Sequence, residues 1–289
     1  MSTKDESLDR SLEKREKIRK GIAAFFKYLI LVIGAIIAIV PVIVVIFGSF
    51  KTGSEFAHSS VLALPKHWTF ENYKTAFIQG GMLTGFKNTA IIEVISMAGK
   101  ILLCSMFAYA ISRFDFKLKT AIITLFVLAM MIPGITQQVA TFQIINGMGL
   151  FNKIWSVIIL NLGTDAMSIF IFMQYLDNIS VSLDESAYLE GANYFQVFWK
   201  IILPLLSAPI TTVLIISGVG IYNDFYNPLL YMPDPNLAVV STALYAFKGP
   251  FGTNWAVILA GVVIVVVPVF ILFLFLQKYI YNSMAGAVK

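Results

Sequence analysis

Six long runs of apolar residues alternate with shorter polar segments along the chain. A helix needs about 20 apolar residues to cross the hydrocarbon core of a membrane. The runs are continuously apolar, whereas the strands of a membrane barrel alternate in polarity over about ten residues. They predict spanning helices over about residues 28–50, 88–112, 118–135, 154–176, 201–222 and 255–277. The sequence therefore predicts an all-α integral membrane protein with six transmembrane helices.

Helix-breaking residues lie inside several of these runs. Pro41 should kink the first helix, and Pro133 lies near the far end of the third. The fourth run is interrupted by Asn161, Gly163 and Asp165. The first run is longer than the apolar core of a signal peptide, which has about 7–15 residues, so we expect it to remain as an anchor.

Charge is scarce and unevenly distributed. Charged residues make up 13% of the chain, against roughly 25% in soluble domains. Eight of the 21 Lys and Arg residues lie in the first 27 residues, which indicates a membrane-orientation signal and no nucleic-acid partner. Because basic residues concentrate on the cytoplasmic side, we expect both termini in the cytoplasm. The predicted organisation is a basic arm over residues 1–27 and a transmembrane domain over residues 28–289.

The residues that would carry enzyme chemistry are sparse. Cys104 is the single cysteine, and His58 and His67 have no cysteine nearby, so the sequence predicts no disulfide and no metal site. The chain has no Gly-rich phosphate loop ending in Lys and Ser or Thr, and no dinucleotide fingerprint. We expect no cofactor on this chain. Active transport would then draw its energy from a partner or from an ion gradient.

The segment between the fourth and fifth runs, Ser182–Pro204, predicts two short helices. Ser182 and Glu185 have the spacing of a capping box, and Gly191 is placed to end the first helix with a positive φ. Asn193 and Gln196 repeat the capping pattern before a second helix. That helix should lead directly into the fifth span, with Pro204 near the membrane surface, where it bends the chain.

Small and acidic residues in this loop indicate an approach by another surface. Small side chains let a second backbone come close, and they occur at Ser186, Ala187, Gly191 and Ala192. Glu190 lies near the helix C-terminus, where the helix dipole disfavours an acid, so it indicates a basic partner elsewhere. Spacing alone agrees equally well with an ordinary surface helix whose acids are solvated.

The same loop resembles the EAA loop of bacterial ABC importer permeases, whose pattern is Glu-Ala-Ala-x3-Gly-x9-Ile-x-Leu-Pro. The matching residues are Glu185-Ser186-Ala187, Gly191, Ile201, Leu203 and Pro204. The usual Asp before the glycine is Glu190 here, and the second small residue is Ser186. Both changes keep charge or size.

The resemblance extends over about Leu64–Lys289 and is closest to the smaller permease of the maltose-type, carbohydrate-importing branch. Further matching segments are Leu64-Pro65, Asn72-Tyr73, Asn88-Thr89, Ala108–Phe114, Ile132-Pro133, Gly149-Leu150 and the tail Gln277–Lys289. One departure is Tyr222-Asn223, where the family often has Trp-Asn.

The resemblance implies a permease of an ATP-driven sugar importer in a bacterial plasma membrane. Its partners would be a second homologous permease, two ATPase subunits that use ATP and Mg, and an extracytoplasmic solute-binding protein. Membrane lipid would surround the permeases. The residues implied to couple to the ATPase are Glu185, Ser186, Ala187, Glu190, Gly191, Ala192, Leu203 and Pro204. The residues implied to contact the binding protein are Tyr231, Pro233, Asp234, Pro235 and Asn236, in the outer loop 223–254. The branch imports di- and oligosaccharides, and related permeases import polyols.

Polar residues within the predicted spans are functional candidates, because a charge in mid-bilayer costs roughly 2.5–3.5 kcal/mol on insertion scales. Candidate contacts with the pore or sugar are Glu93, Lys100, Asn161, Asp165 and Asn223. Glu93 and Lys100 share a helix face and could pair with other spans or across subunits. Asp165, grouped with Asn161 and Thr164, could equally form an interhelical hydrogen bond.

Three other functions compete with the importer hypothesis. An ion-coupled secondary transporter would need inverted repeats and ionisable residues at matched positions, and Glu93, Lys100 and Asp165 show no such symmetry. A membrane-anchored enzyme would need a nucleophile with a base, or a metal set. A non-transporting scaffold would neither bind an ATPase nor stimulate ATP hydrolysis.

Overall fold

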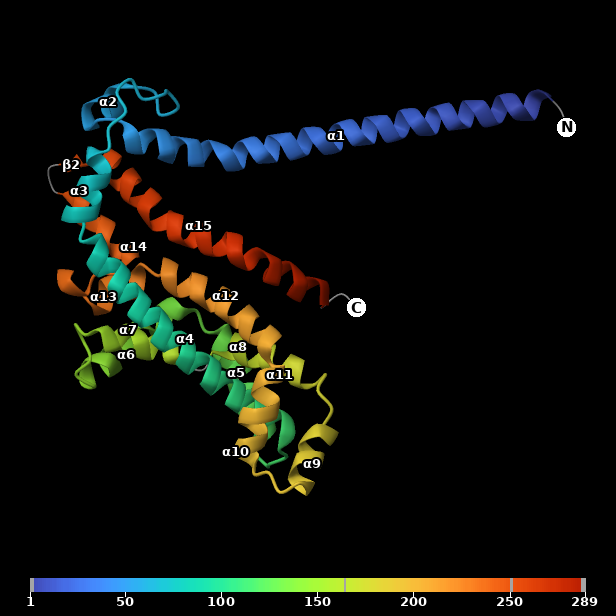
Figure 1. Cartoon of the computed structure of the whole chain (residues 1–289), viewed down its shortest axis with the longest axis vertical. Helices are drawn as coiled ribbons and strands as arrows, with labels where there is room; N and C mark the ends of the chain where they lie inside the picture. Colours follow the sequence, from blue (N-terminus) through green and yellow to red (C-terminus); the bar gives the residue numbers. More distant parts are fainter. Residues whose placement is uncertain (1–2, 164, 250–251, 287–289) are drawn as a thin grey trace. The chain divides into compact units, whose positions relative to one another are not determined.

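A computed structural model describes residues 3–163, 165–249 and 252–286, and these residues are almost entirely helical (Figure 1). Thr164 and the tail residues Ala287, Val288 and Lys289 lie outside the described residues. The membrane-associated helices and their connections are α1 Thr3–Phe50, α2 Gly53–His58, α3 Glu71–Gln79, α4 Met82–Arg113, α5 Lys119–Met131, α6 Gly134–Gly147, α7 Ile154–Leu162 and α8 Ala166–Leu176. They are followed by α9 Ser182–Leu189, α10 Tyr194–Val197, the π-helix η1 Phe198–Ile202, α11 Leu203–Leu205 and α12 Ser207–Asn223. The remaining elements are α13 Tyr226–Tyr231, η2 Pro235–Leu237, α14 Val240–Ala243, η3 Leu244–Phe247, the two-residue strands β1 Lys248–Gly249 and β2 Gly252–Thr253, and α15 Trp255–Gly286.

Four segments within the described ranges are long and apolar enough to cross a membrane: Arg19–Phe50, Met82–Arg113, Ile154–Leu176 and Trp255–Phe275. Two bent helix pairs also qualify, α5 with α6 and Tyr194–Leu205 with α12. Counting each bent pair as one crossing gives the six crossings that the sequence predicts. The predicted interruption of the fourth span is confirmed, because α7 ends at Leu162 and Asp165 caps the start of α8.

The predicted third span is wrong in shape, and the bend predicted at Pro204 before the fifth span lies at Leu206 instead. The third ends at Met131, and the chain then turns by 108° into α6. At about 1.5 Å per residue, the 13 residues of α5 rise about 20 Å, which is short of a bilayer core of about 30 Å. Pro133 explains the break, because it has no N–H to continue the helix of α5.

The fifth span is not one continuous helix from Ile201. The chain bends by 72° at Leu206, between α11 and α12. Pro209 has no N–H to donate to the Leu205 carbonyl, and its ring would clash with that carbonyl in a continuous helix. Pro204 similarly leaves the carbonyl of Lys200 without its usual partner, inside a stretch where the helix widens to π geometry.

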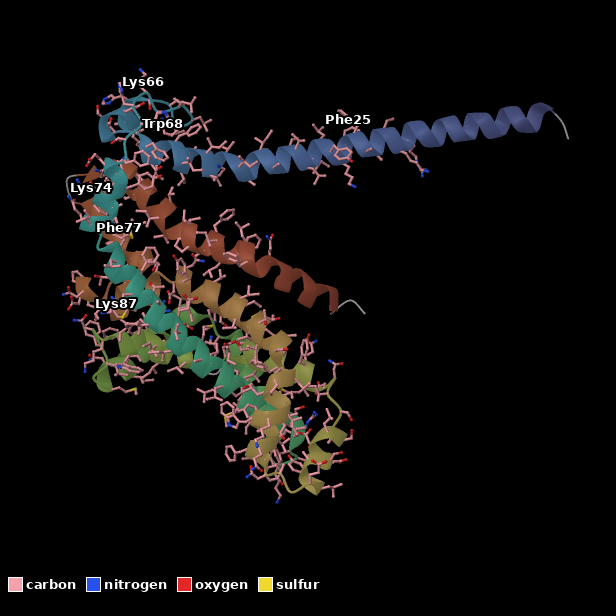
Figure 2. All side chains as sticks on the ribbon, in the orientation of Figure 1. Phe25, Lys66, Trp68, Lys74, Phe77 and Lys87 are labelled. Atoms are coloured by element: carbon pink, nitrogen blue, oxygen red, sulfur yellow. The ribbon has the colours of Figure 1, made fainter. Side chains whose placement is uncertain are left out.

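The chain divides into two compact units, and the first comprises Met1–Tyr73 and Asn254–Val263. In this unit α1 continues through Pro41, and the apolar helical segment begins at Arg19, within the predicted arm, where Phe25 is 64% exposed (Figure 2). The fully buried Lys51 donates from Nζ to Ser59 Oγ at 3.0 Å and to the Ser60 carbonyl at 2.7 Å. These bonds close the loop that carries α2.

The second unit comprises Lys74–Thr253 and Ile264–Lys289 and is built around α4. Helices α7, α8 and α12 pack along α4 (Figure 1). One buried cluster includes Cys104, Phe172 and Ile202, and another includes Ile92 and Ile158. Because α4 contributes to both clusters, it connects the two ends of this unit.

A charged pair joins α4 to α8 within the membrane-spanning region. Lys100 Nζ lies 2.9 Å from Asp165 Oδ2, and the two side chains are 10% and 40% exposed. Asp165 also accepts hydrogen bonds from the Ser168 amide and hydroxyl, both at 2.8 Å, and so caps α8. The interhelical role is thus the one that the geometry supports for Asp165, and the partner of Lys100 is Asp165, not Glu93.

Removing one member of this pair should destabilise the chain more than removing both. We expect Lys100→Met to lower the free energy of unfolding by about 1–3 kcal/mol, less than for a fully enclosed pair because Asp165 is partly exposed. The double variant Lys100→Met/Asp165→Asn should recover most of the loss, because Asn keeps the helix cap without the charge. Thermal unfolding in detergent measures both effects. A double variant less stable than Lys100→Met would contradict this account.

Candidate functional site

The first helix of the Ser182–Pro204 loop, α9, does not begin with the predicted capping box. Ser182 is already the first helical residue, and Glu185 donates its amide to the Val181 carbonyl at 3.1 Å. The Ser180 hydroxyl instead accepts from the Ser182 amide at 3.3 Å and pairs with the Ser182 hydroxyl at 2.7 Å, in a turn that precedes the helix. The Glu185 carboxylate is therefore exposed and available to a partner.

Gly191 ends α9 as predicted. Its φ of +88° lies in the left-handed region, which favours glycine. The Gly191 amide donates to the Tyr188 carbonyl at 3.0 Å, and the Ala192 amide donates to the Ala187 carbonyl at 2.9 Å. These two bonds form a Schellman motif and satisfy the last carbonyls of α9.

The second predicted cap is also confirmed. Asn193 Oδ1 accepts from the Gln196 amide at 2.9 Å, and Gln196 Oε1 accepts from the Asn193 amide at 2.8 Å. The chain then runs through η1 and α11 to the bend before α12. The loop is therefore a short helix, a glycine turn and a second helix, each with satisfied ends.

The inward face of α9 is fixed by a buried ion pair that the sequence analysis missed. Arg113 Nε donates to Asp184 Oδ2 at 2.9 Å, and the two side chains are 6% and 3% exposed. Tyr109 donates to Asp184 Oδ1 at 3.0 Å and lies 3.1 Å from the Tyr188 hydroxyl. A signal was present, because Asp184, Ala187 and Tyr188 have i, i+3, i+4 spacing and so share one face of the helix.

Arg113 bonds to more than α9. Its two terminal nitrogens donate to the Leu176 carbonyl at 3.4 Å and to the Ile179 carbonyl at 2.7 Å. The last residue of α4 thus holds the end of α8, the α8–α9 connection and α9 itself.

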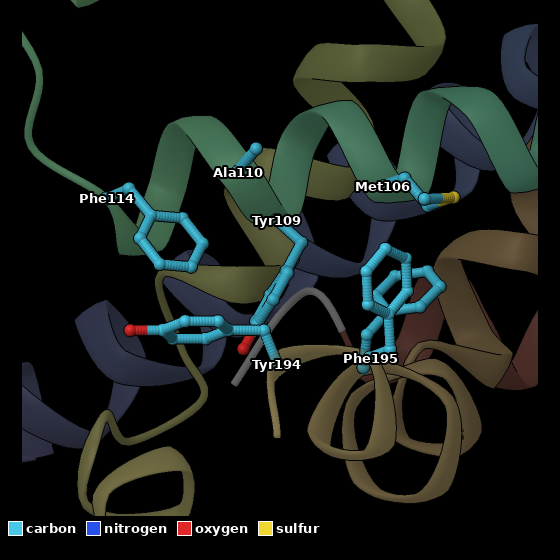
Figure 3. A pocket seen from close by; sticks show the side chains of 7 residues that line it. Met106, Tyr109, Ala110, Phe114, Tyr194 and Phe195 are labelled. Atoms are coloured by element: carbon cyan, nitrogen blue, oxygen red, sulfur yellow. The ribbon is translucent and has the colours of Figure 1, made fainter.

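Aromatic rings pack α10 against the same end of α4. The ring of Phe114 meets Tyr194 edge-on at 5.2 Å, and Tyr109 lies 5.7 Å from Phe198. Tyr188 meets Tyr194 at 5.1 Å, so α9 joins the cluster. The rings of Tyr109, Phe114, Tyr194 and Phe198 help to line an apolar pocket of about 180 Å³ at the end of α4 (Figure 3).

The opposite face of α9 is open. Glu185, Ser186, Leu189 and Glu190, which we name the α9 outer face, are all exposed. Leu189 is 90% exposed, more than any other large apolar side chain that the structure describes.

The remaining residues implied for coupling divide between surface and interior. Ala187 is buried and Ala192 is half-buried, so these two pack inward and do not offer the close approach expected of them. Gly191 and Pro204 are exposed, whereas Leu203 is half-buried.

The outer segment after α12 presents some of the residues predicted to meet a binding protein. Pro233, Pro235 and Asn236 are exposed and Asp234 is half-buried, beside a pocket of about 300 Å³. Tyr231 does not belong with them, because it is 2% exposed and its ring packs 6.0 Å from Phe142. Burial also raises the pKa of the Tyr231 phenol.

This outer segment is attached to the beginning of α4. Asn88 Nδ2 donates to the carbonyls of Asn236, at 3.0 Å, and Ala238, at 2.9 Å. The hydroxyl of Thr89 accepts from the Val240 amide at 3.1 Å. Asn88 and Thr89 are both buried.

The other polar residues in the spans do not form one cluster. Asn161 and Asn223 donate to carbonyls of their own helices, Val157 and Val219, at 2.9 and 3.0 Å. Glu93 faces α12, where Gly218 leaves room for its carboxylate. Within the described ranges, His, Cys, Asp and Glu form no group of three that could hold a metal ion.

Comparison with known proteins identifies the class to which this architecture belongs. The profile of the family described as "Binding-protein-dependent transport system inner membrane component" matches residues 100–286, and the chain belongs to this family. It is a multi-pass protein of the bacterial plasma membrane and a permease component of an ABC transporter.

Individual relatives match over nearly the whole chain. The galactooligosaccharides transport system permease protein GanQ of Bacillus subtilis is 32% identical, over 94% of this chain and 98% of the relative. The multiple sugar-binding transport system permease protein MsmG of Streptococcus mutans is 30% identical, over 96% of this chain and 100% of the relative. A solved bacterial ABC transporter involved in the import of the acidic polysaccharide alginate shares the fold, with a TM-score of 0.80, 20% identity and coverage of 89% and 96%.

The turn at Gly191 supplies a test of the loop's architecture. Gly191→Ala should destabilise the end of α9 by about 1–2 kcal/mol, because the left-handed region is strained for other residues. We expect the amides of residues 191 and 192 to exchange hydrogen about 5–30 times faster. Gly191→Asn should have a smaller effect. The matched control Gly147→Ala, at a position with open space and no positive φ, should leave exchange unchanged.

Proposed function

We propose that the chain is a permease subunit of an ATP-driven importer of di- or oligosaccharides, and that the α9 outer face docks it onto a partner ATPase. The sugar class is supported by the names of the relatives, which transport galactooligosaccharides and multiple sugars. The chain contributes no ATPase site of its own. ATP and Mg are bound by the partner.

The observation that carries this proposal is the contrast between the two faces of α9. One face is fixed to the body by a buried ion pair, while the other presents Leu189 at 90% exposure. Because the inner contacts hold α9 in place, its outer face presents Leu189 between Glu185 and Glu190 as a preformed surface, which a partner can cover without first ordering the helix. We therefore expect the α9 outer face to bind in a groove on the surface of a partner protein.

The chemistry of this face specifies the partner's groove. Leu189 requires an apolar hollow, and Glu185 and Glu190 on either side require basic or amide groups. Gly191 offers an exposed backbone without a side chain. An ATPase subunit with a groove of this kind would hold α9 and move it during the ATP cycle.

The complete transporter would contain this chain, a second homologous permease, two ATPase subunits and a solute-binding protein. The helix bundles of the two permeases would rock between inward-open and outward-open states around a central site. Glu93, Asn161 and Asn223 are the candidates for contact with the pore, because Lys100 and Asp165 are occupied by one another. The binding protein would meet the outer segment Pro233–Asn236.

Polar substitution of Leu189 should disconnect the ATPase. We expect Leu189→Ser to weaken retention of the partner ATPase by about tenfold or more, because full burial of a leucine side chain contributes about 1.5–3 kcal/mol. Leu118→Ser is the matched control, since Leu118 is also exposed, at 64%, and precedes α5. Co-purification from detergent measures retention. Equal retention by Leu189→Ser and the unaltered chain would refute docking through this face.

Gly191→Asp extends the same test to transport. It should leave membrane insertion intact and abolish both sugar uptake and coupling to ATP hydrolysis. Normal sugar uptake by the Gly191→Asp variant would contradict the docking hypothesis. Uptake that persists after removal of the ATPase would instead favour an ion-coupled secondary transporter.

Substitution at the outer segment should affect the solute-binding protein alone. We expect Asn236→Arg to raise by about tenfold the concentration of loaded binding protein that half-saturates ATP hydrolysis, a loss typical of an interface contact. Met148→Arg, at an exposed position after α6, is the control. Titration of the binding protein in proteoliposomes distinguishes Asn236→Arg from the control. A separate thermal-shift panel of the binding protein identifies the sugar as the solute that stabilises it. An unchanged titration for Asn236→Arg would remove this segment from the interface.

A further inference from the structure

We propose that α4 is the strut that joins the ATPase dock to the binding-protein contact, with Arg113 and Asn88 as the positioning residues that clamp its two ends. The inference rests on the proposed function and deepens it. It assigns the connection between the two partner surfaces to particular side chains of this chain.

The inner clamp is Arg113. It holds Asp184 of α9 by a buried ion pair and also binds the carbonyls of Leu176 and Ile179. Because the guanidinium donates in three directions, α9 cannot shift without moving Arg113 or breaking these bonds. A displacement of α9 therefore also moves the end of α4.

The outer clamp is Asn88, assisted by Thr89. Asn88 holds the carbonyls of Asn236 and Ala238, which belong to the segment proposed to meet the binding protein, and Thr89 holds the Val240 amide. Figure 1 shows α13 and α14 at this end of α4, and α9 and α10 at the other. Helical rise over the 25 steps from Asn88 to Arg113 spans about 37 Å, so the two clamps lie near opposite faces of the membrane.

The other route from α9, along the chain into α12, is less direct. It passes through the π-helix η1, the three-residue α11 and a bend of 72° at Leu206. Bends of this kind, between Pro204 and Pro209, absorb rotation. In contrast, α4 is a single unbroken helix, and it is held in mid-membrane by the Lys100–Asp165 pair.

Stimulation of the ATPase by the binding protein requires a change at one end of α4 to reach the other end, so one measurement tests the connection between the two clamps. The readout is the ratio of ATP hydrolysis with and without sugar-loaded binding protein, for the assembled transporter in proteoliposomes. We expect Arg113→Lys and Asn88→Ala each to reduce this ratio by about fivefold or more, the usual scale of a coupling between sites. Their controls are Asp115→Asn, which removes an exposed ion pair beside Arg113, and Asn146→Ala, at an exposed position in α6.

The double variant distinguishes two explanations: that both clamps act through α4, or that each substitution causes a separate local defect. If both clamps act on one element, Arg113→Lys/Asn88→Ala should lose little more coupling than the stronger single variant. Independent, multiplying losses would overturn the proposal, and so would single variants with the unaltered ratio. Where Arg113→Lys does not assemble, Tyr109→Phe decides, because it removes one bond to Asp184 and keeps the ion pair. A lowered ratio supports the strut and an unchanged ratio refutes it.

Failure of the proposed function would look different. In that case the unaltered chain would retain no ATPase and show no stimulation by a binding protein. An unaltered chain with full stimulation, alongside clamp variants that match it, would overturn the strut alone.

Discussion

The ion pair between Arg113 and Asp184 is the interaction on which the arrangement of the Ser182–Pro204 loop depends. Both side chains are almost fully buried, so removal of either one would leave an uncompensated charge at a cost of about 3–5 kcal/mol. Its geometry satisfies that demand, since the guanidinium and the carboxylate each have further hydrogen-bond partners. A helix of eight residues has little stability of its own. Its fixed position is conferred by the end of α4.

A membrane chain has few ways to fix its helices, because lipid is as apolar as the helix surfaces. Packing of small residues and interhelical polar contacts therefore carry much of the specificity. The polar contacts described here fall at three levels of α4: Asn88 near one end, Lys100 in the middle and Arg113 at the other end. The few polar side chains of α4 therefore fix the positions of its neighbours, because each of the three binds a second element.

Local chemistry determined which features could be predicted from the sequence. The ends of α9 and α10 depend on neighbours within five residues, so Gly191 and the Asn193–Gln196 cap were predictable. The capping box at the start of α9 did not form because the helix begins at Ser182 and the Glu185 amide donates to the Val181 carbonyl instead of a serine hydroxyl. Pairing between distant residues, as in Arg113–Asp184, requires the packing of helices that the pattern of apolar runs does not encode. The bend at the start of the fifth span was predicted from Pro204, and it lies two residues further on, at Leu206, because Pro209 also prevents the helix from continuing there.

The exposure of Leu189 has a consequence for the life of the chain before assembly. A subunit without its ATPase holds a bare apolar side chain in the aqueous phase, on a helix too firmly held to fold it away. An exposed apolar side chain of this kind can be bound by chaperones and proteases as well as by the partner subunit. Under the proposed docking, the ATPase would cover Leu189, so a copy of the chain without its partner would differ from an assembled one by this exposed apolar side chain.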